Sequence, residues 1–464
     1  MADKSLSLLL AEWRGVLDVS PGGEAKVGDP ARLRSLVMDG LARVAVFGET
    51  EAERDQARAL IWEAARQTGL WSASIQPLYD AMGSGEVTGL TTPAINLRGM
   101  VYDSARAVAA AAKSHGVGVF IFELARSEMG YTFQRPGEYA AVVTAAAVRE
   151  GLEGPLFIQG DHYQVNAAKF AQGGQTRAGE IQAIKDLLAE SIRAGYRNID
   201  IDSSTIVDLS KSTVMEQQRE NFTTSAELAA HTRSLEPEGT TISIGGEIGE
   251  VGKKNSTPEE FRAYMDGLLG ELSRLRPGAK GPSKISIQTG TSHGGVPLPD
   301  GSIAQVKIDF GVLKEISRIA RDEYGMAGAV QHGASTLPSE AFHHFPQADA
   351  CEVHLATDFQ NIVMDHPVFP KELKAEMYAW LDKECASERK AGMTPEQFYY
   401  KTRKKAWGPF KRQTWDLAEP IRAELRRALQ EKFEFLFGKL GVAGSTKVAR
   451  ERVRPSGAGR PVAR

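Results

Sequence analysis

The sequence predicts an α/β protein built on a (β/α)8 (TIM) barrel, with helical extensions at its N-terminal and C-terminal ends. Two observations predict this fold. Eight short apolar runs rich in β-forming residues alternate with longer amphipathic stretches, which is the pattern of repeated βα units. Acidic residues and histidines follow most of these runs, and functional side chains of such barrels gather at the carboxyl ends of the strands.

Residues 1–90 are predicted to form a helical N-terminal extension. The segment EAERDQARALIWEAARQTGLW carries its apolar residues at helical spacing and ends near a glycine. The pattern changes at TTPAINLRGM, where the first β-rich run begins. This change places the start of the barrel near residue 91.

The barrel is predicted over residues 91–369. Its eight strands are expected at 93–97, 117–124, 155–160, 198–201, 241–247, 284–290, 327–332 and 351–355. Amphipathic segments between them, such as 179–195 and 257–275, are expected to form outer helices. The second of these begins with TPEE, a capping-box pattern that favours a helix start.

The chain after residue 369 is predicted to leave the barrel pattern. Residues 370–440 are charged and have helical periodicity, and we expect a helical C-terminal extension there. Residues 441–464 form a basic segment that we expect to be disordered. No aromatic residues interleave with its basic ones, which favours a solvated tail over one that binds nucleic acid.

The composition favours a globular enzyme with a small-molecule partner. The chain has 464 residues, of which 42% are hydrophobic and 25% charged, and a formal net charge of -3, so no basic surplus indicates nucleic acid or an anionic membrane. No apolar run is long enough to span a bilayer, and a signal-peptide cleavage region is missing. With only Cys351 and Cys385 present, we expect a cytoplasmic protein. The amphipathic helices of the extensions suggest a homo-oligomer.

Histidines and carboxylates at the strand ends predict a divalent metal site, with Zn²⁺ as the expected ion. His162, His293 and His332 follow the third, sixth and seventh strands, and Glu247 follows the fifth as a fourth candidate ligand. One such histidine would more often be a hydrogen-bonded structural residue, but three at matching strand ends favour metal binding. Asp202, after the fourth strand, is either a further ligand or a helix N-cap.

Glycine-rich turns beside these histidines predict phosphate binding. TGTSHGG and HGAST place small residues and hydroxyls directly after a strand, where backbone N–H groups can bind phosphate without a lysine. The candidates are Gly294, Gly333, Ser335 and Thr357. A glycine after a strand also serves turn geometry alone, so the neighbouring metal candidates carry much of this argument.

Together these motifs resemble the class II, metal-dependent fructose- and tagatose-bisphosphate aldolases. The resemblance covers roughly residues 90–362, and its motifs occur in the family's order. They are DH at 161–162, DIDSS at 200–204, GGEIG at 245–249, GTSHG at 290–294, HGAS at 332–335 and ATDFQN at 356–361.

The resemblance implies a lyase that makes or breaks a carbon–carbon bond in a phosphorylated ketose through a metal-stabilised enediolate. It implies that His162 holds the metal while its neighbour Asp161 exchanges a proton with a substrate hydroxyl. Glu250, in the loop after the fifth strand, becomes the candidate that exchanges a proton with the donor ketone. The implied substrate contacts further include Asn96, His354 and Asp358.

The sequence departs from the family's pattern in the eighth strand. Where the family usually has an asparagine and an aspartate, this chain has His354 and Ala356. Both positions normally touch the substrate in the family, so we expect a substrate other than fructose 1,6-bisphosphate.

Two other functions stay open at this stage. A metal-dependent sugar-phosphate isomerase or epimerase would polarise the same ketone without cleaving a bond. A non-catalytic subunit of a tagatose-bisphosphate aldolase would share the barrel, although it would not need Asp161 and three histidines. A Schiff-base aldolase is disfavoured, because no lysine lies in the middle of a strand and Lys284 stands at a strand's start.

Overall fold

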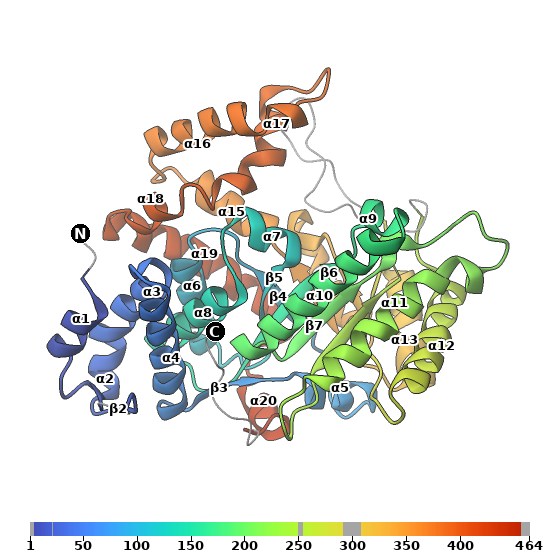
Figure 1. The fold of residues 1–464 in the computed structure, drawn as a ribbon, viewed down its shortest axis with the longest axis horizontal. Coiled ribbons are helices and arrows are strands. Elements are labelled where there is room, and N and C mark those ends of the chain that lie inside the picture. Colours follow the sequence, from blue (N-terminus) through green and yellow to red (C-terminus); the bar gives the residue numbers. More distant parts are fainter. Residues whose placement is uncertain (1–3, 21, 249–253, 291–307, 456–464) are drawn as a thin grey trace.

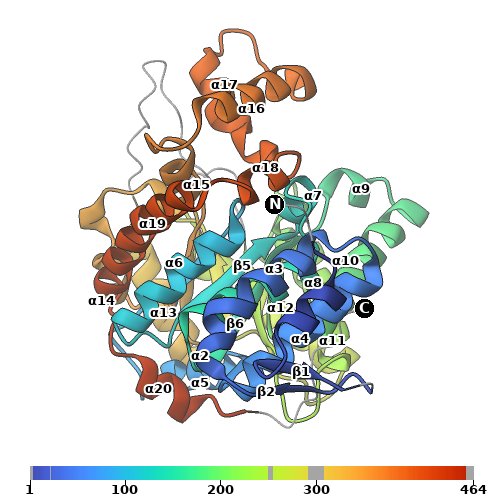
Figure 2. The ribbon, with the colours of Figure 1, turned by 90° about the vertical axis from the view of Figure 1, so that its left-hand side faces the viewer.

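The computed structural model describes residues 4–20, 22–248, 254–290 and 308–455. Its centre is a closed barrel of parallel strands with helices around it (Figures 1 and 2), which confirms the predicted fold. Successive strands pair with one another, and the last pairs with the first to close the ring. The barrel strands are β4 (Thr92–Asn96), β5 (Ile121–Ala125), β6 (Gly154–Gln164), β7 (Asn198–Asp202), β8 (Ser243–Glu247), β9 (Lys284–Ile287), β10 (Ala329–Gln331) and β11 (Glu352–Leu355).

All eight predicted strands exist, with ends that differ by a few residues. The largest shifts are of four residues: β5 was expected from residue 117 and begins at Ile121, and β6 was expected to end at residue 160 and continues to Gln164. The amides of Gly118 and Val119 donate to the Ser445 hydroxyl at 3.0 and 3.1 Å instead of to a neighbouring strand. Because a residue far along the chain takes these hydrogen bonds, local sequence could not reveal the late start.

Long helices cover the outside of the barrel. The predicted helix at 257–275 begins at Pro258, with Thr257 as its N-cap and Glu260 completing the expected capping box. The outer helices are α6 (Val101–Ser114), α8 (Pro136–Glu150), α10 (Gly174–Ala194), α11 (Val214–Ser234), α12 (Pro258–Leu275) and α13 (Phe310–Tyr324). Shorter helices follow the strand ends: α7 (Arg126–Tyr131), α9 (Ala167–Ala171), η2 (Ser204–Ile206), η3 (Ala334–Thr336), η4 (Ser339–Ala341), α14 (His344–Gln347) and α15 (Thr357–Met364).

The N-terminal region packs on one side and on the bottom of the barrel. It contains strands as well as the expected helices. β3 pairs in parallel with the first part of β6, and β1 pairs with β2 in an antiparallel hairpin. Tyr79, on α5, is buried below the barrel and bonds through its hydroxyl to Glu352. The elements are α1 (Leu6–Glu12), β1 (Leu17–Val19), β2 (Ala25–Val27), α2 (Pro30–Arg32), η1 (Leu33–Val37), α3 (Met38–Phe47), α4 (Glu51–Gln67), β3 (Leu70–Ala73) and α5 (Gln76–Gly83).

The chain after α15 returns to the barrel in two places. Helix α19 runs beside α6 (Figure 2), and its Phe437 meets Phe120, the residue before β5, with ring centroids 5.9 Å apart. The elements are α16 (Lys371–Glu384), η5 (Ala386–Glu388), α17 (Pro395–Thr402), η6 (Arg403–Ala406), α18 (Lys411–Trp415), α19 (Glu419–Lys439) and α20 (Thr446–Arg452). None of the helices in the described ranges has the length and apolar character that crossing a membrane requires.

The prediction of disorder from residue 441 onward is wrong for α20. This helix follows Ser445, whose hydroxyl binds the chain just before β5, and Ala449 is fully buried. Arg452 of this helix lies 2.6 Å from Glu86, in the segment between α5 and β4. Two of the basic residues of α20, Arg450 and Arg452, therefore pair with carboxylates of neighbouring segments.

A buried lysine organises the interior of the barrel. Lys284 is fully buried, and its ammonium contacts Glu352, the Asp200 carboxylate at 3.0 Å and the Gln159 side-chain oxygen at 2.7 Å. Burial works to lower the pKa of Lys284, but the carboxylates of Asp200 and Glu352 raise it above the ordinary value. The lysine is therefore protonated and ion-paired, which agrees with the argument against a Schiff base.

Replacing Lys284 by methionine should lower the free energy of unfolding by about 3–5 kcal/mol, because it leaves two buried carboxylates without their cation. Chemical denaturation measures this change. The control is Lys280→Met, since Lys280 forms an exposed pair with Asp80 at 2.6 Å and its loss should cost under about 1 kcal/mol. Equal, small losses in both variants would contradict the assigned role of Lys284.

Candidate active site

Asp161 and His162 point into the same space because β6 is irregular at this point. Neighbouring side chains of a regular strand point to opposite faces. In β6 the pairing with β7 shifts register between Gly160 and Tyr163, and His162 has a φ of 42°, in the left-handed region. A bulge of this kind re-aims side chains, and here it brings the His162 ring within 3.8 Å of the Asp161 carboxylate.

The packing beneath the bulge requires a glycine at position 160. A Cβ on Gly160 would lie 2.4 Å from the ring of Tyr163, which is fully buried. The Tyr163 hydroxyl bonds to the Ser191 hydroxyl at 2.5 Å, which fixes the ring in place. The sequence GDHY therefore works as a unit that turns both Asp161 and His162 toward the barrel mouth.

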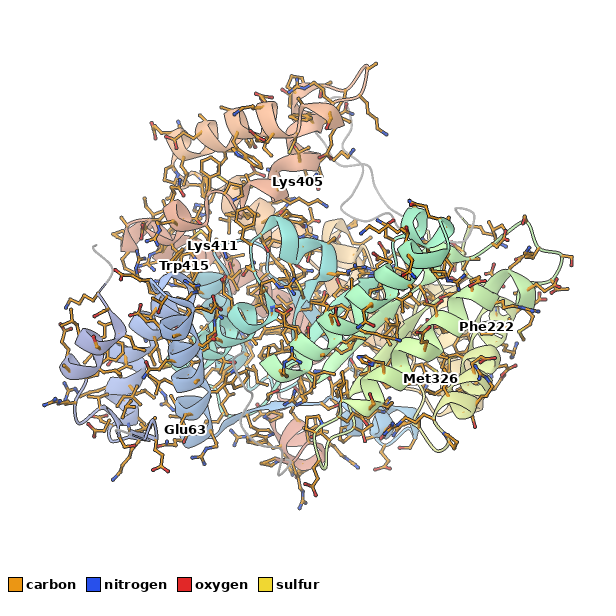
Figure 3. All side chains as sticks on the ribbon, viewed as in Figure 1. Glu63, Phe222, Met326, Lys405, Lys411 and Trp415 are labelled. Carbon is orange, nitrogen blue, oxygen red and sulfur yellow. The ribbon has the colours of Figure 1, made fainter. Side chains whose placement is uncertain are left out.

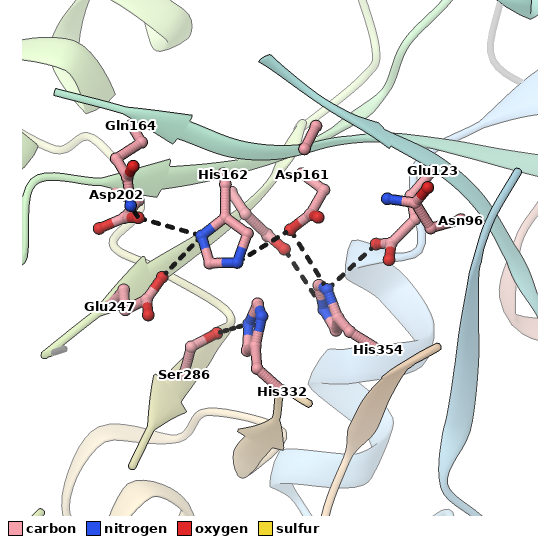
Figure 4. Close-up of polar contacts among 12 residues, drawn as sticks. Asn96, Glu123, Asp161, His162, Gln164, Asp202, Glu247, Ser286, His332 and His354 are labelled. Carbon is pink, nitrogen blue, oxygen red and sulfur yellow. Dashed lines mark hydrogen bonds and ion pairs between the residues drawn. The ribbon is translucent and has the colours of Figure 1, made fainter. Parts of the chain in front are cut away.

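Two carboxylates flank His162 on the side away from Asp161 (Figure 4). Its Nδ1 lies 3.0 Å from Asp202 and 3.1 Å from Glu247. The second oxygen of Asp202 accepts the backbone N–H of Ser204 at 3.0 Å. One oxygen of Asp202 therefore orders the turn after β7 and the other faces the histidine, whereas the N-cap of η2 is Ser203 and not Asp202.

A row of three imidazole rings crosses the barrel mouth (Figure 4). The His332 ring lies between the other two, with centroids 4.4 Å from His162 and 4.1 Å from His354. His332 also contacts Ser286 on β9, with Nε2 2.9 Å from the hydroxyl. His162 comes from β6, His354 from β11 and His332 from the position directly after β10, so three strand ends meet at one point.

His354 connects this row to the buried interior. Its Nδ1 lies 3.2 Å from Glu123 and 3.3 Å from Asp161, and its Nε2 lies 2.6 Å from Glu352. Burial works against a charge on His354, but Glu123 and the other carboxylates raise the pKa of the imidazole above its usual value. The chain of contacts runs from Lys284 through Glu352 and His354 to Asp161.

The concentration of carboxylates around His162 suits a cation. Burial and the neighbouring Asp202 raise the pKa of Glu247 to about 7. Burial works to lower the pKa of His162, but Asp161 and Glu247 raise it well above its usual value. A divalent ion would relieve this crowding, because it neutralises nearby carboxylates and takes neutral imidazole as a ligand.

The available donor atoms fit such an ion. One ligand atom each from Asp161, His162 and His332 lies within 4.8 Å of the others, and the same holds for His162, Asp202 and Glu247. Imidazole nitrogen combined with carboxylate oxygen is a typical ligand set for zinc and similar ions in catalytic sites. His162 belongs to both groups and is therefore the centre of the candidate metal site.

A cavity of about 540 Å³ opens next to these groups. One wall is formed by Asn96 and Arg98, which both bond to Glu128 at 2.6 Å. Sequence analysis missed Arg98, Glu123 and Glu128. A charged residue inside an apolar run, such as Glu123 in VFIFEL, was the available signal for one of them.

Most of the predicted substrate residues line this cavity. They are Asn96, Gly333, Ser335, His354 and Thr357. Gly333 has a φ of 69°, so a glycine suits this turn. The Ser335 hydroxyl accepts the N–H of Ala356 at 2.6 Å, which ties the loop after β10 to the loop after β11.

Other predicted residues lie apart from the cavity or outside the described ranges. Asp358 pairs with Lys432 on α19 at 2.8 Å and does not belong to the described cavity wall. The expectation that Asp358 contacts substrate therefore lacks support from its position. His293, Gly294 and Glu250 lie outside the residues that the structure describes.

Solved structures of low sequence identity resemble this chain. A probable tagatose 6 phosphate kinase from Sinorhizobium meliloti matches with a TM-score of 0.52 and 15% identity, over 80% of this chain and 96% of its own. This likeness supports the fold. A fructose-bisphosphate aldolase from Campylobacter jejuni matches with a TM-score of 0.49 and 19% identity, over 81% of this chain and 96% of its own. The YdjI aldolase from Escherichia coli matches with a TM-score of 0.47 and 12% identity, over 81% and 99%.

The family comparison is more direct. Comparison with curated protein sequences finds no match. The model of the family described as fructose-bisphosphate aldolase class-II matches residues 84–438, which span all eight barrel strands and all but the last residue of helix α19. The chain therefore belongs to the class II fructose-bisphosphate aldolase family.

Proposed function

We propose that the protein is a divalent-metal-dependent lyase that makes or breaks a carbon–carbon bond in a phosphorylated ketose. The observation that carries this proposal is the bulge in β6, which turns Asp161 and His162 toward one space beside the cavity. A non-glycine residue in the left-handed region costs about 1–3 kcal/mol, and such strain is concentrated at functional sites. Family membership supports the same reaction class.

His162 and His332 would hold the ion, with Glu247 and Asp202 as carboxylate ligands and His293 as the proposed third imidazole. The ion, for which we expect zinc, supplies polarisation of the ketone carbonyl and stabilises the negative charge that develops as the carbon–carbon bond breaks.

Asp161 is the proposed acid–base group. In the cleavage direction its carboxylate accepts the proton of the hydroxyl on the carbon that becomes the aldehyde. In the synthetic direction it returns that proton to the aldehyde oxygen. The His354 Nδ1, 3.3 Å from the Asp161 carboxylate, orients it between two imidazoles. Glu250 is the proposed residue that exchanges a proton with the donor carbon.

The phosphate of the donor half would bind at the turn after β10. Gly333 and Ser335 line the cavity next to His332, and the start of α15 at Thr357 lies on the same wall. Backbone N–H groups at such turns and helix starts favour an anion. His354 and Ala356 would meet the sugar between this phosphate and Asp161.

The proposed metal ligands can be tested by measuring the metal content of variants. Replacing His332 by alanine should remove most of the bound metal, because it takes one imidazole from the ligand set. Elemental analysis of the purified protein measures metal per chain, and His162→Ala and His293→Ala should give the same result. The control is His344→Ala, since His344 is exposed and bonds to Gln347 at 3.1 Å, away from the site. Full metal occupancy in His332→Ala would remove His332 from the ligand set.

The role of Asp161 can be tested with an isosteric change. Asp161→Asn should keep its fold and metal while turnover falls by about a hundredfold or more, because the amide cannot exchange the proton. The control is Asp322→Asn, since Asp322 is exposed on α13 and pairs with Arg318 at 3.0 Å. Steady-state kinetics and metal content are measured side by side. Near-normal turnover of Asp161→Asn would remove this residue from the mechanism.

The eighth strand predicts the substrate preference. We expect weak activity on fructose 1,6-bisphosphate and higher kcat/KM on a ketose phosphate that differs in stereochemistry or in its far end, because His354 and Ala356 change the groups that meet the sugar. The measurement is kcat/KM over a panel of phosphorylated ketoses, with trapping of the aldehyde product. The Ala356→Asp variant is run beside the parent and should shift the preference toward fructose 1,6-bisphosphate. If the parent already prefers that sugar, the two differences do not determine specificity.

A further inference from the structure

The N-terminal region places one tyrosine hydroxyl beneath the interior of the barrel. Tyr79 lies on α5 and is fully buried, and its hydroxyl donates a hydrogen bond to Glu352, the first residue of β11. Burial, and after it the charge of Glu352, hold the pKa of Tyr79 well above its usual value, so the hydroxyl keeps its proton and is the donor. Tyr79 precedes residue 84, where the match to the family begins, and so lies outside the matched part of the chain.

Hydrogen bonds to two barrel strands fix α5 in this place. The N–H of Ile75, just before α5, donates to the Asn198 side chain of β7 at 2.9 Å. The hydroxyl of Ser74 accepts the N–H of Ser243, the first residue of β8, at 3.1 Å. Because the residues before α5 are bound to two strands of the barrel, the position of the helix beneath Glu352 is fixed.

The two oxygens of the Glu352 carboxylate have different partners. Oε1 accepts hydrogen bonds from Lys284, from the Gln159 side chain at 2.9 Å and from the His354 Nε2 at 2.6 Å. Oε2 accepts the hydrogen bond from Tyr79. Without that hydroxyl, Oε2 would be buried without its donor, and the carboxylate would rotate to share the donors of Oε1 between both oxygens. The position of Oε1 opposite His354 therefore depends on Tyr79.

Glu352 in turn fixes the imidazole of His354. Burial works to raise the pKa of Glu352, but Lys284 and His354 lower it to about 2, so the carboxylate is an acceptor and the imidazole Nε2 carries a proton. The Nδ1 on the other side of the ring lies 3.3 Å from the Asp161 carboxylate (Figure 4). A carboxylate that holds one nitrogen of a histidine sets the direction in which the other nitrogen points. A change at Glu352 therefore moves the group next to Asp161.

We propose that Tyr79 is a positioning residue for Asp161. It acts through the two groups between them, Glu352 and His354. This inference rests on the proposed aldolase function, in which Asp161 exchanges a proton with the substrate. Tyr79 is not among the residues that line the described cavity, so it affects the rate of the reaction and not the binding of the substrate. The N-terminal region then has a defined role, because it supports the acid–base group from the end of the barrel opposite the cavity.

The first test is Tyr79→Phe in the full chain with its metal bound. Its kcat should fall about tenfold, the scale of a lost hydrogen bond to a charged group, while KM and metal content stay as in the parent. The substrate is the phosphorylated ketose that the parent cleaves fastest. An unchanged kcat would overturn the proposal, and so would a rise in KM that accounts for the whole loss of kcat/KM.

The matched control is Tyr102→Phe. Tyr102, on α6, is also buried, and its hydroxyl donates to Asp39 of α3 at 2.7 Å, so this variant too loses a tyrosine–carboxylate bond between the N-terminal region and the barrel. Its ring stacks on Trp415 with centroids 5.7 Å apart, and Trp415 in Figure 3 lies far from α5 in the same view in Figure 1. The control should keep the kcat of the parent. An equal loss of kcat in both variants would contradict a specific role of Tyr79.

A double-mutant cycle shows whether Tyr79 acts through Asp161. Tyr79→Phe is combined with Asp161→Asn, which removes the group that is to be positioned. The loss of the hydroxyl then has nothing to act on, so the kcat of the double variant should equal that of Asp161→Asn. A further fall of about tenfold would mean that the tyrosine affects turnover without Asp161, and the proposal would be wrong.

A spectroscopic measurement separates failure of this proposal from failure of the proposed function. If the parent cleaves none of the phosphorylated ketoses, the aldolase proposal fails and the NMR signal of the His354 Nε2–H proton decides. This signal is identified, in protein labelled at its histidine nitrogens, by its loss in His354→Gln. Tyr79→Phe should shift the signal and Tyr102→Phe should not, because the first variant changes the hydrogen bonds of Glu352 and the second does not. A signal at the same position in the parent and in Tyr79→Phe would refute the link between the tyrosine and His354.

Discussion

The arrangement of the site depends on a single backbone irregularity in β6. Without the register shift between Gly160 and Tyr163, Asp161 and His162 would face opposite sides of the barrel wall. The register shift depends on residues that are close in sequence. Tyr163 fills the space that a side chain at position 160 would need, and His162 takes the left-handed conformation. The fold supports this strain because the strand is paired on both sides, with β5 and with β7.

The buried ion network extends this constraint through the barrel. Lys284 at the start of β9 neutralises Glu352 and Asp200, and Glu352 in turn holds one nitrogen of His354. The other nitrogen faces Asp161 and Glu123. Replacement of one of these groups would therefore leave its partner buried without an opposite charge. A buried ion network of this kind is stable only when every member keeps its partner. The orientation of Asp161 thus depends on charges at the opposite end of the barrel.

Sequence reasoning identified the barrel because each strand is an apolar run between turn residues, a signal that needs no tertiary information. The same reasoning placed Asp161, His162, His332 and Glu247 at strand ends, and strand ends of a closed parallel barrel must converge. It could not place groups whose role depends on a distant partner. Glu128 joins the wall through its bonds to Asn96 and Arg98, and α20 follows Ser445, whose hydroxyl accepts the N–H groups of Gly118 and Val119 before β5.

The position of Lys404 likewise shows that the sequence does not reveal which residues meet when they lie far apart in the chain. In sequence, RKK at 403–405 is an ordinary cluster of cations in a charged helical region. Its three members have different partners in space, since Arg403 binds α15, Lys405 pairs with Glu388 and Lys404 enters the cavity. Close to them in sequence, the Trp407 ring packs so near to Gly99 that a Cβ there would lie 2.1 Å from it. The barrel is that of the family, whereas His354 and Ala356 depart from the pattern that the resemblance implies for the eighth strand. In the proposed function, metal binding and sugar recognition use separate groups, so the second can change while the first is kept.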